Sequence, residues 1–124
     1  MTVSRAKGAK KKADDLFRNI VRARGVCAWC GETDYSKLQT SHLVGRSWNW
    51  TRTDEDNADC LCASCHAAWG SFSLAAVPES LRADTAERLE RMREKAIAGV
   101  SRKFDWDAEV VRLKQVWQAV EAAA

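Results

Sequence analysis

The chain carries only two histidines, and both lie within or directly beside a framework of paired cysteines. In chain order the paired cysteines and the two histidines are Cys27, Cys30, His42, Cys62, Cys65 and His66. Thiolates bind zinc tetrahedrally at about 2.3 Å, and two CxxC pairs supply the four thiolates that one ion needs. We therefore predict a structural zinc ion held by the four cysteines. An imidazole titrates near pH ~6.5, so each histidine is suited to act as a base or as a metal ligand at neutral pH.

The cysteine usage also indicates a reducing compartment. The chain has five cysteines, no recognisable secretory segment, and no apolar stretch that approaches the ~20 residues of a membrane span. We therefore expect a cytoplasmic protein without a membrane partner, in which CxxC pairs bind metal rather than form disulfides. Cys60 lies outside both pairs and is expected to be a small buried strand residue.

Between the two pairs lie 31 residues, Gly31 to Leu61, which is longer than the loop of a short zinc ribbon. This length leaves room for a functional hairpin between the two halves of the zinc site. The cysteines alone do not distinguish such a hairpin from a purely structural zinc module.

Asn57 stands at a position fixed by the same spacing. It precedes Cys62 by five residues and His66 by nine. The order CxxC, His, Asn and CxxCH resembles the zinc-binding branch of the HNH, or ββα-metal, nucleases. That resemblance implies that His42 acts as general base on a water, that His66 helps to hold a catalytic Mg²⁺ or Mn²⁺ ion, and that Asn57 braces the loop that orients the base. Taken singly, Asn57 is an ordinary turn residue, and a lone histidine is more often structural than catalytic.

Three longer segments in the same region resemble one particular group of HNH nucleases. Three segments are similar to the motifs of the phage NinG-like (Rap) recombination nucleases: His42-Leu-Val-Gly-Arg46, Arg52-Thr-Asp54-Glu-Asp-Asn57 and Cys62-Ala-Ser-Cys65-His66. The similarity covers about residues 27–70. It implies cleavage of branched DNA during phage recombination, in the cytoplasm of a bacterial host.

Ser41 departs from the commonest HNH pattern, in which an Asp or a His at this position supplies another ligand to the catalytic ion. Asp59, Asp34 or waters are the candidates to replace that ligand, and the sequence does not choose between them. The departure is also the main support for a function of another class, a non-catalytic zinc module that binds nucleic acid or protein.

Arginines and tryptophans before Asn57 are the candidate contacts to DNA. Arg46 and Arg52 flank the expected position of a phosphodiester, and a guanidinium binds phosphate through two parallel hydrogen bonds. The alternative for each arginine is an ion pair with one of the acidic residues at 54–56. Trp48 and Trp50 are suited either to stack on unpaired bases or to anchor a long loop by burial.

Positive charge is concentrated near the N-terminus. Residues 1–24 carry eight basic and two acidic side chains, a balance of +6 in a chain whose net charge is +3. We expect residues 1–12 to form a flexible basic arm in which Lys10, Lys11 and Lys12 contact DNA phosphates and release counterions. A solvated tail without a partner is the alternative.

Hydrophobic spacing predicts an α+β fold with a ββα core. We expect a helix over 14–24, a strand carrying His42 over 38–44, an ordered loop over 45–56, a returning strand over 58–61, and a short helix presenting His66 over about 62–71.

Two further helices are expected after the core. Pro78 can occupy a first helical position, and apolar residues follow at helical spacing: Leu81, Leu89, Met92, Ala96 and Val100. A second apolar seam, with spacings of 4, 3, 4 and 3, consists of Trp106, Val110, Leu113, Trp117 and Val120. With 99–105 as the connection, the two helices would form an antiparallel hairpin against the core or against a second subunit in a homodimer.

These patterns divide the chain into a flexible basic arm (1–12), an HNH-like core held together by zinc (13–75) and a C-terminal helical extension (76–124). The function that the resemblance implies is metal-dependent hydrolysis of DNA phosphodiesters, with Zn²⁺ as the structural ion and Mg²⁺ or Mn²⁺ as the catalytic ion.

Overall fold

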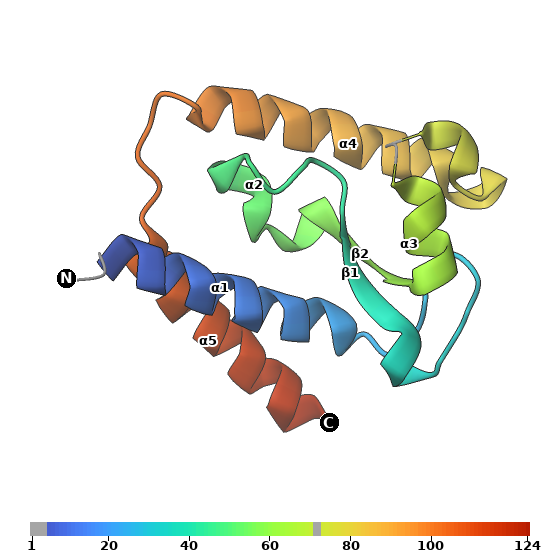
Figure 1. The fold of residues 1–124 in the computed structure, drawn as a ribbon, viewed down its shortest axis with the longest axis horizontal. Helices are drawn as coiled ribbons and strands as arrows, with labels where there is room; N and C mark the ends of the chain where they lie inside the picture. The colour runs from blue at the N-terminus through green and yellow to red at the C-terminus, as the bar shows by residue number, and fades with distance from the viewer. Residues whose placement is uncertain (1–4, 71–72) are drawn as a thin grey trace.

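A two-stranded antiparallel sheet lies at the centre of the chain, in contact with helices α1 and α3 (Figure 1). The computed structural model describes residues 5–70 and 73–124. In chain order the elements are α1 (Arg5–Arg22), η1 (Tyr35–Lys37), β1 (Leu38–His42), α2 (Asn49–Arg52), η2 (Glu55–Asn57), β2 (Ala58–Cys62), α3 (Ala63–Trp69), η3 (Leu74–Ala76), α4 (Glu79–Gly99) and α5 (Trp106–Ala123). Within the described residues, no helix combines the length and apolar character that a membrane span requires.

The two strands pair over their whole length, from Leu38 opposite Cys62 to His42 opposite Ala58. The pairing therefore brings the strand that carries one histidine beside the strand that carries the third cysteine of the framework. The order β1, β2 and α3 confirms the ββα core that the sequence predicts.

Side chains alternate along a strand, so β1 presents different residues to the helices on its two sides. Thr40 and His42 face α1: the Thr40 hydroxyl donates to a carbonyl of that helix over 3.3 Å, and the Phe17 ring lies 5.6 Å from the His42 ring. Gln39 faces α3, where it meets His66. The strand thus contributes side chains to its contacts with both helices.

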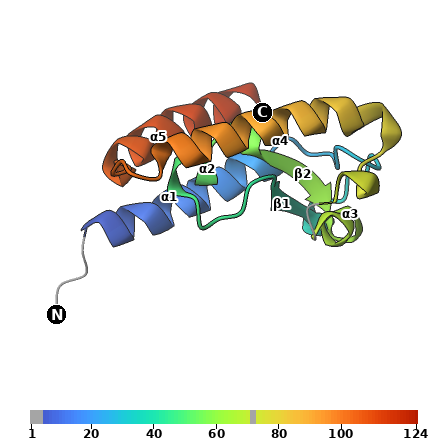
Figure 2. The ribbon, with the colours of Figure 1, turned by 90° about the horizontal axis from the view of Figure 1, so that it is seen from above.

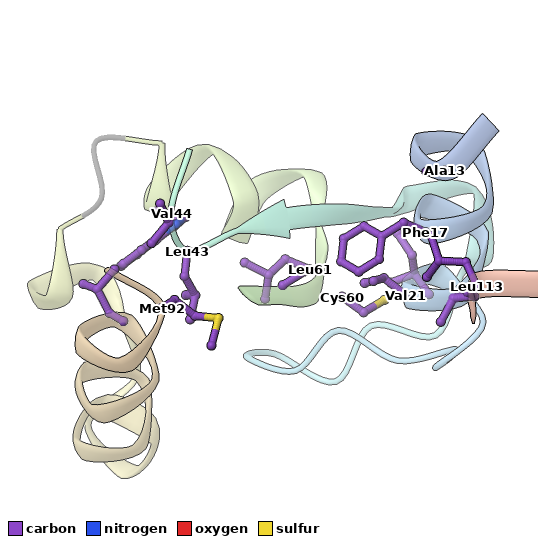
Figure 3. Close-up of a cluster of buried hydrophobic side chains, with 14 of the residues drawn as sticks. Ala13, Phe17, Val21, Leu43, Val44, Cys60, Leu61, Met92 and Leu113 are labelled. Atoms are coloured by element: carbon purple, nitrogen blue, oxygen red, sulfur yellow. The ribbon is translucent and has the colours of Figure 1, made fainter. Parts of the chain in front are cut away.

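The hydrophobic core extends from the contact between α1 and α5, past β2, to α4 (Figure 3). Phe17 and Val21 of α1 lie with Leu113 of α5 at one end, and Met92 of α4 lies at the other. Leu61 of β2 is buried between them. Helices from both ends of the chain therefore share one core with the sheet.

α1 begins at Arg5 rather than at the expected residue 14, so most of the segment for which the composition predicts a flexible arm is helical. Residues 1–4 lie outside the described residues. Packing against α5 explains the difference, because helix stability in proteins comes mainly from a packed face. Ala13 is fully buried, Ala9 packs against the core, and the Lys10 ammonium lies 5.6 Å from the centre of the Trp106 ring.

α4 and α5 lie at opposite edges of the molecule in Figure 1. α5 runs beside α1, as Figure 2 also shows, and buries Trp106, Val110 and Leu113 of its apolar seam. α4 packs mainly against α2 and η2. The two predicted helices are present, but their main contacts are with the rest of the chain rather than with each other.

Trp50 fixes the connection between α4 and α5. Its indole N–H donates to the carbonyl of Arg102 over 3.0 Å, and its ring packs edge-on against Phe104 with centroids 5.1 Å apart. Gly99 approaches the same ring so closely that an added Cβ would overlap the ring carbons. These contacts favour the interpretation of Trp50 as an anchor of the loop.

Candidate functional site

The four paired cysteines come together as the sequence predicts. Their sulfur atoms all lie within 4.8 Å of one another, and the sulfurs of Cys30 and Cys62 are 3.6 Å apart. Tetrahedral zinc bound at about 2.3 Å requires sulfurs about 3.8 Å apart. The cluster is therefore positioned to bind a metal ion and is consistent with a structural zinc site. Cys60 lies outside the cluster and is buried on β2, where burial raises the pKa of its thiol.

Backbone geometry holds the first cysteine pair in place. Gly31 adopts a φ of 82°, a left-handed conformation that favours glycine, and its N–H donates to the carbonyl of Cys27 over 3.0 Å. The N–H of Ala28 donates to the carbonyl of Cys60 over 2.8 Å, which ties the pair to β2. Burial of the Cys27 thiol opposes its ionisation, but hydrogen bonds from backbone N–H groups lower its pKa to about 6. The lowered pKa favours the thiolate of Cys27, the form that binds metal, whereas burial raises the pKa of Cys65 in the same cluster.

A cavity of about 700 Å³ lies between α1 and α3, with β1 along its floor. Both histidines line it, His42 from the strand and His66 from α3. Arg18, Arg22 and Arg46 bring positive charge to the same cavity. The structure thus places the two histidines at one cavity, and the surrounding charge suits an anionic ligand such as a phosphodiester.

The imidazole of His42 is fixed by a backbone carbonyl. Its Nε2 donates to the carbonyl of Arg52 over 2.9 Å. In the neutral ring this bond leaves Nδ1 unprotonated, which is the form that a general base requires. Burial lowers the pKa of His42; the Arg52 carbonyl opposes this effect, and the charge of Arg46 adds to it. The ring is therefore held in its neutral form at neutral pH.

His66 is oriented by a side chain of the opposing strand. Its Nδ1 donates to Oε1 of Gln39 over 2.7 Å. In the neutral ring Nε2 is then unprotonated and is the nitrogen available to a metal ion. His66 follows Cys65 directly, so α3 carries one cysteine of the cluster and one histidine of the cavity.

Asn57 is fully buried and closes the segment between β1 and β2. Its Oδ1 accepts from the N–H of Val44 over 2.8 Å. Its Nδ2 donates to the carbonyls of Val44 and Thr51 over 3.1 and 2.9 Å. These three bonds tie the start of the loop to its end, which fits the bracing role that the resemblance implies for this residue.

Arg46 and Arg52 differ in how they are held. The Arg52 guanidinium makes two bonds to the Asp14 carboxylate of α1, over 2.8 and 2.7 Å, and donates through Nη1 to the carbonyl of Arg46 over 2.6 Å. Arg46 lies 3.6 Å from the same carboxylate, and its side chain is 60% exposed against 15% for Arg52. Arg46 is therefore the arginine that remains accessible to a phosphate.

The acidic residues at 54–59 pair with the C-terminal helices and not with these arginines. Asp54 pairs with Lys95, Asp56 with Arg91, Glu55 with Arg112 and Asp59 with Arg88. The expected alternative for Arg46 and Arg52, an ion pair within the loop, is therefore not found among the described residues. Their acidic partner is Asp14 instead.

Neither acidic candidate to replace the ligand missing at Ser41 lines the cavity. Asp59 accepts two bonds from Arg88, over 3.1 and 3.0 Å, and Asp34 caps η1 by accepting from Ser36. Ser41 itself is buried. Among the described residues lining the cavity, Asp14 is the one carboxylate, and it is bound to arginine. Among the described residues that line the cavity, His66 is the metal-ligating side chain on α3.

The other expected DNA contacts lie on two surfaces. Lys10 donates to Asn49 over 3.0 Å, Lys11 pairs with Asp15 over 3.1 Å, and Lys12 lies close enough to Lys114 to lower the pKa of that group. Trp48 is half-exposed and lines a shallow apolar cavity of about 470 Å³ that also includes Ile97 and Arg93 of α4.

Asp14 is the site residue that sequence reasoning missed. Its place in the cavity depends on the packing of α1 against β1, over a separation of 38 residues from Arg52. One local signal was present: Asp14 precedes Phe17 by three residues, and residues at this spacing share a helix face. The apolar side chain at 17 therefore carries the carboxylate at 14 toward the same strand.

An HNH endonuclease family model matches residues 27–76, from the first cysteine pair through η3. The matched segment and the cysteine cluster fit an HNH nuclease. No curated protein and no solved structure matches the chain. The HNH match suggests nuclease activity and implies DNA as the partner. α1, α4 and α5 lie outside the matched segment.

Proposed function

We propose that the protein is a metal-dependent DNA endonuclease of HNH type. The observation that carries the proposal is the arrangement of the two histidines, which line one positively charged cavity from different elements. Each ring has one nitrogen bound to an acceptor of the chain and one nitrogen left for chemistry. One ring nitrogen of His42 is therefore free to act as a base, and one ring nitrogen of His66 is free to bind a metal ion.

Each residue has a separate task in the proposed hydrolysis. Nδ1 of His42 takes a proton from the attacking water, while the Arg52 carbonyl holds Nε2. The exposed guanidinium of Arg46 binds the phosphate, and Asn57 holds the loop in register. Nε2 of His66 would hold the catalytic Mg²⁺ or Mn²⁺ ion. When bound, that ion supplies stabilisation of the charge that develops on the phosphate and the leaving oxygen.

Exposed side chains outside the cavity are the candidates for further contacts to DNA. We assign them to Lys10, Lys11 and Lys12 of α1 and to the exposed ring of Trp48. Arg52 and Trp50 are occupied by contacts within the chain, so we assign them to loop stability rather than to DNA. Zinc in the four-cysteine cluster holds the second strand and α3 in place.

The finer substrate assignment comes from the resemblance to the NinG-like nucleases. It indicates branched DNA in phage recombination, within the cytoplasm of a bacterial host. Comparing cleavage of a linear duplex, a nicked duplex and a four-way junction of matched sequence tests this assignment, and equal rates on all three would reject it.

A non-catalytic zinc module that binds nucleic acid is the second candidate. The specific observation in its favour is the burial of Ser41, together with the use of Asp14, Asp34 and Asp59 in contacts within the chain. A catalytic ion in this cavity would depend on His66 and on water for its ligands. Weak ion binding would leave a protein that retains DNA affinity without cleavage.

A nicking assay with added Mg²⁺ or Mn²⁺ separates the two candidates. His42→Ala should lower the rate by ~10²–10⁴-fold, because it removes the base, and excess ion should not restore it. His66→Ala should lose both rate and ion affinity, so high ion concentration should partly restore cleavage. If wild-type protein binds DNA but cleaves it no faster than His42→Ala does, the binding module is the correct function.

A further inference from the structure

The carboxylate of Asp14 is connected to the His42 ring through Arg52. Both oxygens of Asp14 accept from the Arg52 guanidinium, over 2.8 and 2.7 Å, and the carbonyl of Arg52 accepts from Nε2 of His42 over 2.9 Å. Two parallel bonds between a guanidinium and a carboxylate fix the plane of both groups. The side chain of Arg52 is 15% exposed and that of Asp14 is 19% exposed, so solvent weakens this pair less than a surface pair.

We infer that Asp14 is a positioning residue for His42: it holds Arg52 so that the carbonyl of Arg52 fixes the orientation and tautomer of the imidazole. The inference rests on the proposed function, in which His42 is the base. Asp14 bonds to the guanidinium of Arg52, and the His42 ring bonds to the carbonyl of Arg52, so Asp14 acts on the ring through Arg52 and is a positioning residue. It also lies on α1, outside the segment that matches the HNH model.

The carbonyl of Arg52 needs such a support because it lies at the end of a short helix in a long connection between the strands. Asn57 supports the neighbouring residue, by donating to the carbonyl of Thr51 over 2.9 Å. Asp14 holds the side chain of Arg52 itself. Nη1 of Arg52 in turn donates to the carbonyl of Arg46 over 2.6 Å. The loop is thus held by an amide from inside the hairpin and by a carboxylate from α1.

The same carboxylate gives the two arginines different tasks. Arg52 uses three guanidinium bonds within the chain, whereas Arg46 lies 3.6 Å from Asp14. Substitution of Asp14 should therefore disturb the orientation of His42 while leaving Arg46 at least as available to phosphate as before. A positioning role predicts a lower kcat without a higher KM.

Asp14→Asn tests the inference, with Asp15→Asn as the matched control. Both variants remove one negative charge from adjacent positions of α1, but Asp15 pairs with the exposed side chains of Lys11 and Arg18 instead of with Arg52. With Mn²⁺ and a duplex oligonucleotide, Asp14→Asn should lower kcat by ~10–10²-fold, because small misplacement of a catalytic group costs about this much. Asp15→Asn should change kcat by less than about twofold. An unchanged kcat in Asp14→Asn, or a raised KM with an unchanged kcat, would overturn the inference.

Arg52→Lys provides a second, independent test of the inference. Lysine keeps the charge but cannot make the two parallel bonds, so the variant should resemble Asp14→Asn in kcat. Because both substitutions break one connection, the double variant should be little worse than either single variant. If the double variant instead lowers kcat by the product of the two single reductions, Asp14 does not act through Arg52. Melting curves of all the variants show whether folding is affected.

The tautomer of His42 provides a readout that needs no cleavage. Nitrogen-15 NMR of wild-type protein should show His42 protonated at Nε2, and Asp14→Asn should show a mixture of tautomers while Asp15→Asn does not. If the tautomer responds to Asp14 but wild-type protein cleaves no DNA, the proposed nuclease function fails and the positioning of His42 stands. If the tautomer is unchanged in Asp14→Asn, the positioning inference itself is wrong.

Discussion

The indole N–H of Trp69 donates to the carbonyl of His42 over 2.9 Å, so the last turn of α3 is bonded to the residue that carries the proposed base. His66 lies one turn earlier on the same helix. This bond sets how far the strand and the helix stand apart, and therefore how far the two histidines stand apart across the cavity. The Trp69 ring also packs edge-on against Trp29, with centroids 6.3 Å apart, beside the first cysteine pair.

Trp69→Phe should lower both stability and activity. The substitution removes one buried hydrogen-bond donor and leaves the His42 carbonyl without it, at an expected cost of about 1–3 kcal/mol in the free energy of unfolding. Urea unfolding measures this cost. Trp117→Phe is the matched control, because Trp117 is only partly buried on α5. Equal stability losses in the two variants would show that the bond to His42 contributes nothing.

Removal of the metal should unfold the core. Structural zinc contributes ~10–16 kcal/mol of apparent binding free energy in small zinc domains, and here the cluster joins the first cysteine pair to β2 and α3. Cys30→Ser should abolish stoichiometric zinc, since Cys30 is an exposed ligand with little other packing. Cys60→Ala should keep one zinc per chain. Elemental analysis with thermal melting checks both, and chelator-treated protein with a native melting curve would contradict the prediction.

Cleavage should persist to a lower pH than an ordinary histidine base allows. Burial lowers the pKa of His42 below its usual value, so the neutral form that acts as base survives as pH falls through ~6.5. The unfolded chain binds the proton more readily, so stability should also decrease as pH drops below that value. A profile of kcat/KM from about pH 5 to about pH 8 locates the acid limb. A midpoint above about pH 7 that disappears in His42→Gln would be incompatible with the buried base.

The exposed lysines of α1 should set part of the salt dependence of DNA binding. Replacing both Lys11 and Lys12 with glutamine should reduce the slope of log affinity against log salt concentration by up to ~0.9 for each DNA phosphate that the variant no longer neutralises. Lys103→Gln is the control for removal of a charge in the connection between α4 and α5. Since the helix buries Ala9 and Ala13 on its other side, stability should change little. An unchanged slope in the double variant would remove α1 from the DNA interface.

Motif spacing was sufficient to predict the four-cysteine cluster and the order of the strands and helix of the core. The CxxC pairs, the strand order and the position of Asn57 depend on short stretches of chain, and the structure brings the four cysteines together as expected. The burial of Asn57 and its three bonds follow from the same register.

The start of α1 and the partner of Arg52 could not be predicted from spacing. Each depends on surfaces supplied by distant segments: α5 packs against α1, and α1 brings Asp14 to a loop 38 residues away. The composition of 1–12, rich in lysine and alanine, is compatible with both a flexible arm and a helix. Only the presence of Trp106 and its neighbours on α5 decides between them.

The ion pairs of the segment at 54–59 have a consequence for how the HNH-like segment can be used. Each of its acidic side chains at 54, 55, 56 and 59 is matched by a basic residue of α4 or α5. Cut out at residues 27–76 and joined to another protein, the segment would carry these carboxylates without their basic partners and would lose the wall of the cavity that α1 supplies. The segment therefore cannot be transferred alone: a transplant must include α1 together with both C-terminal helices.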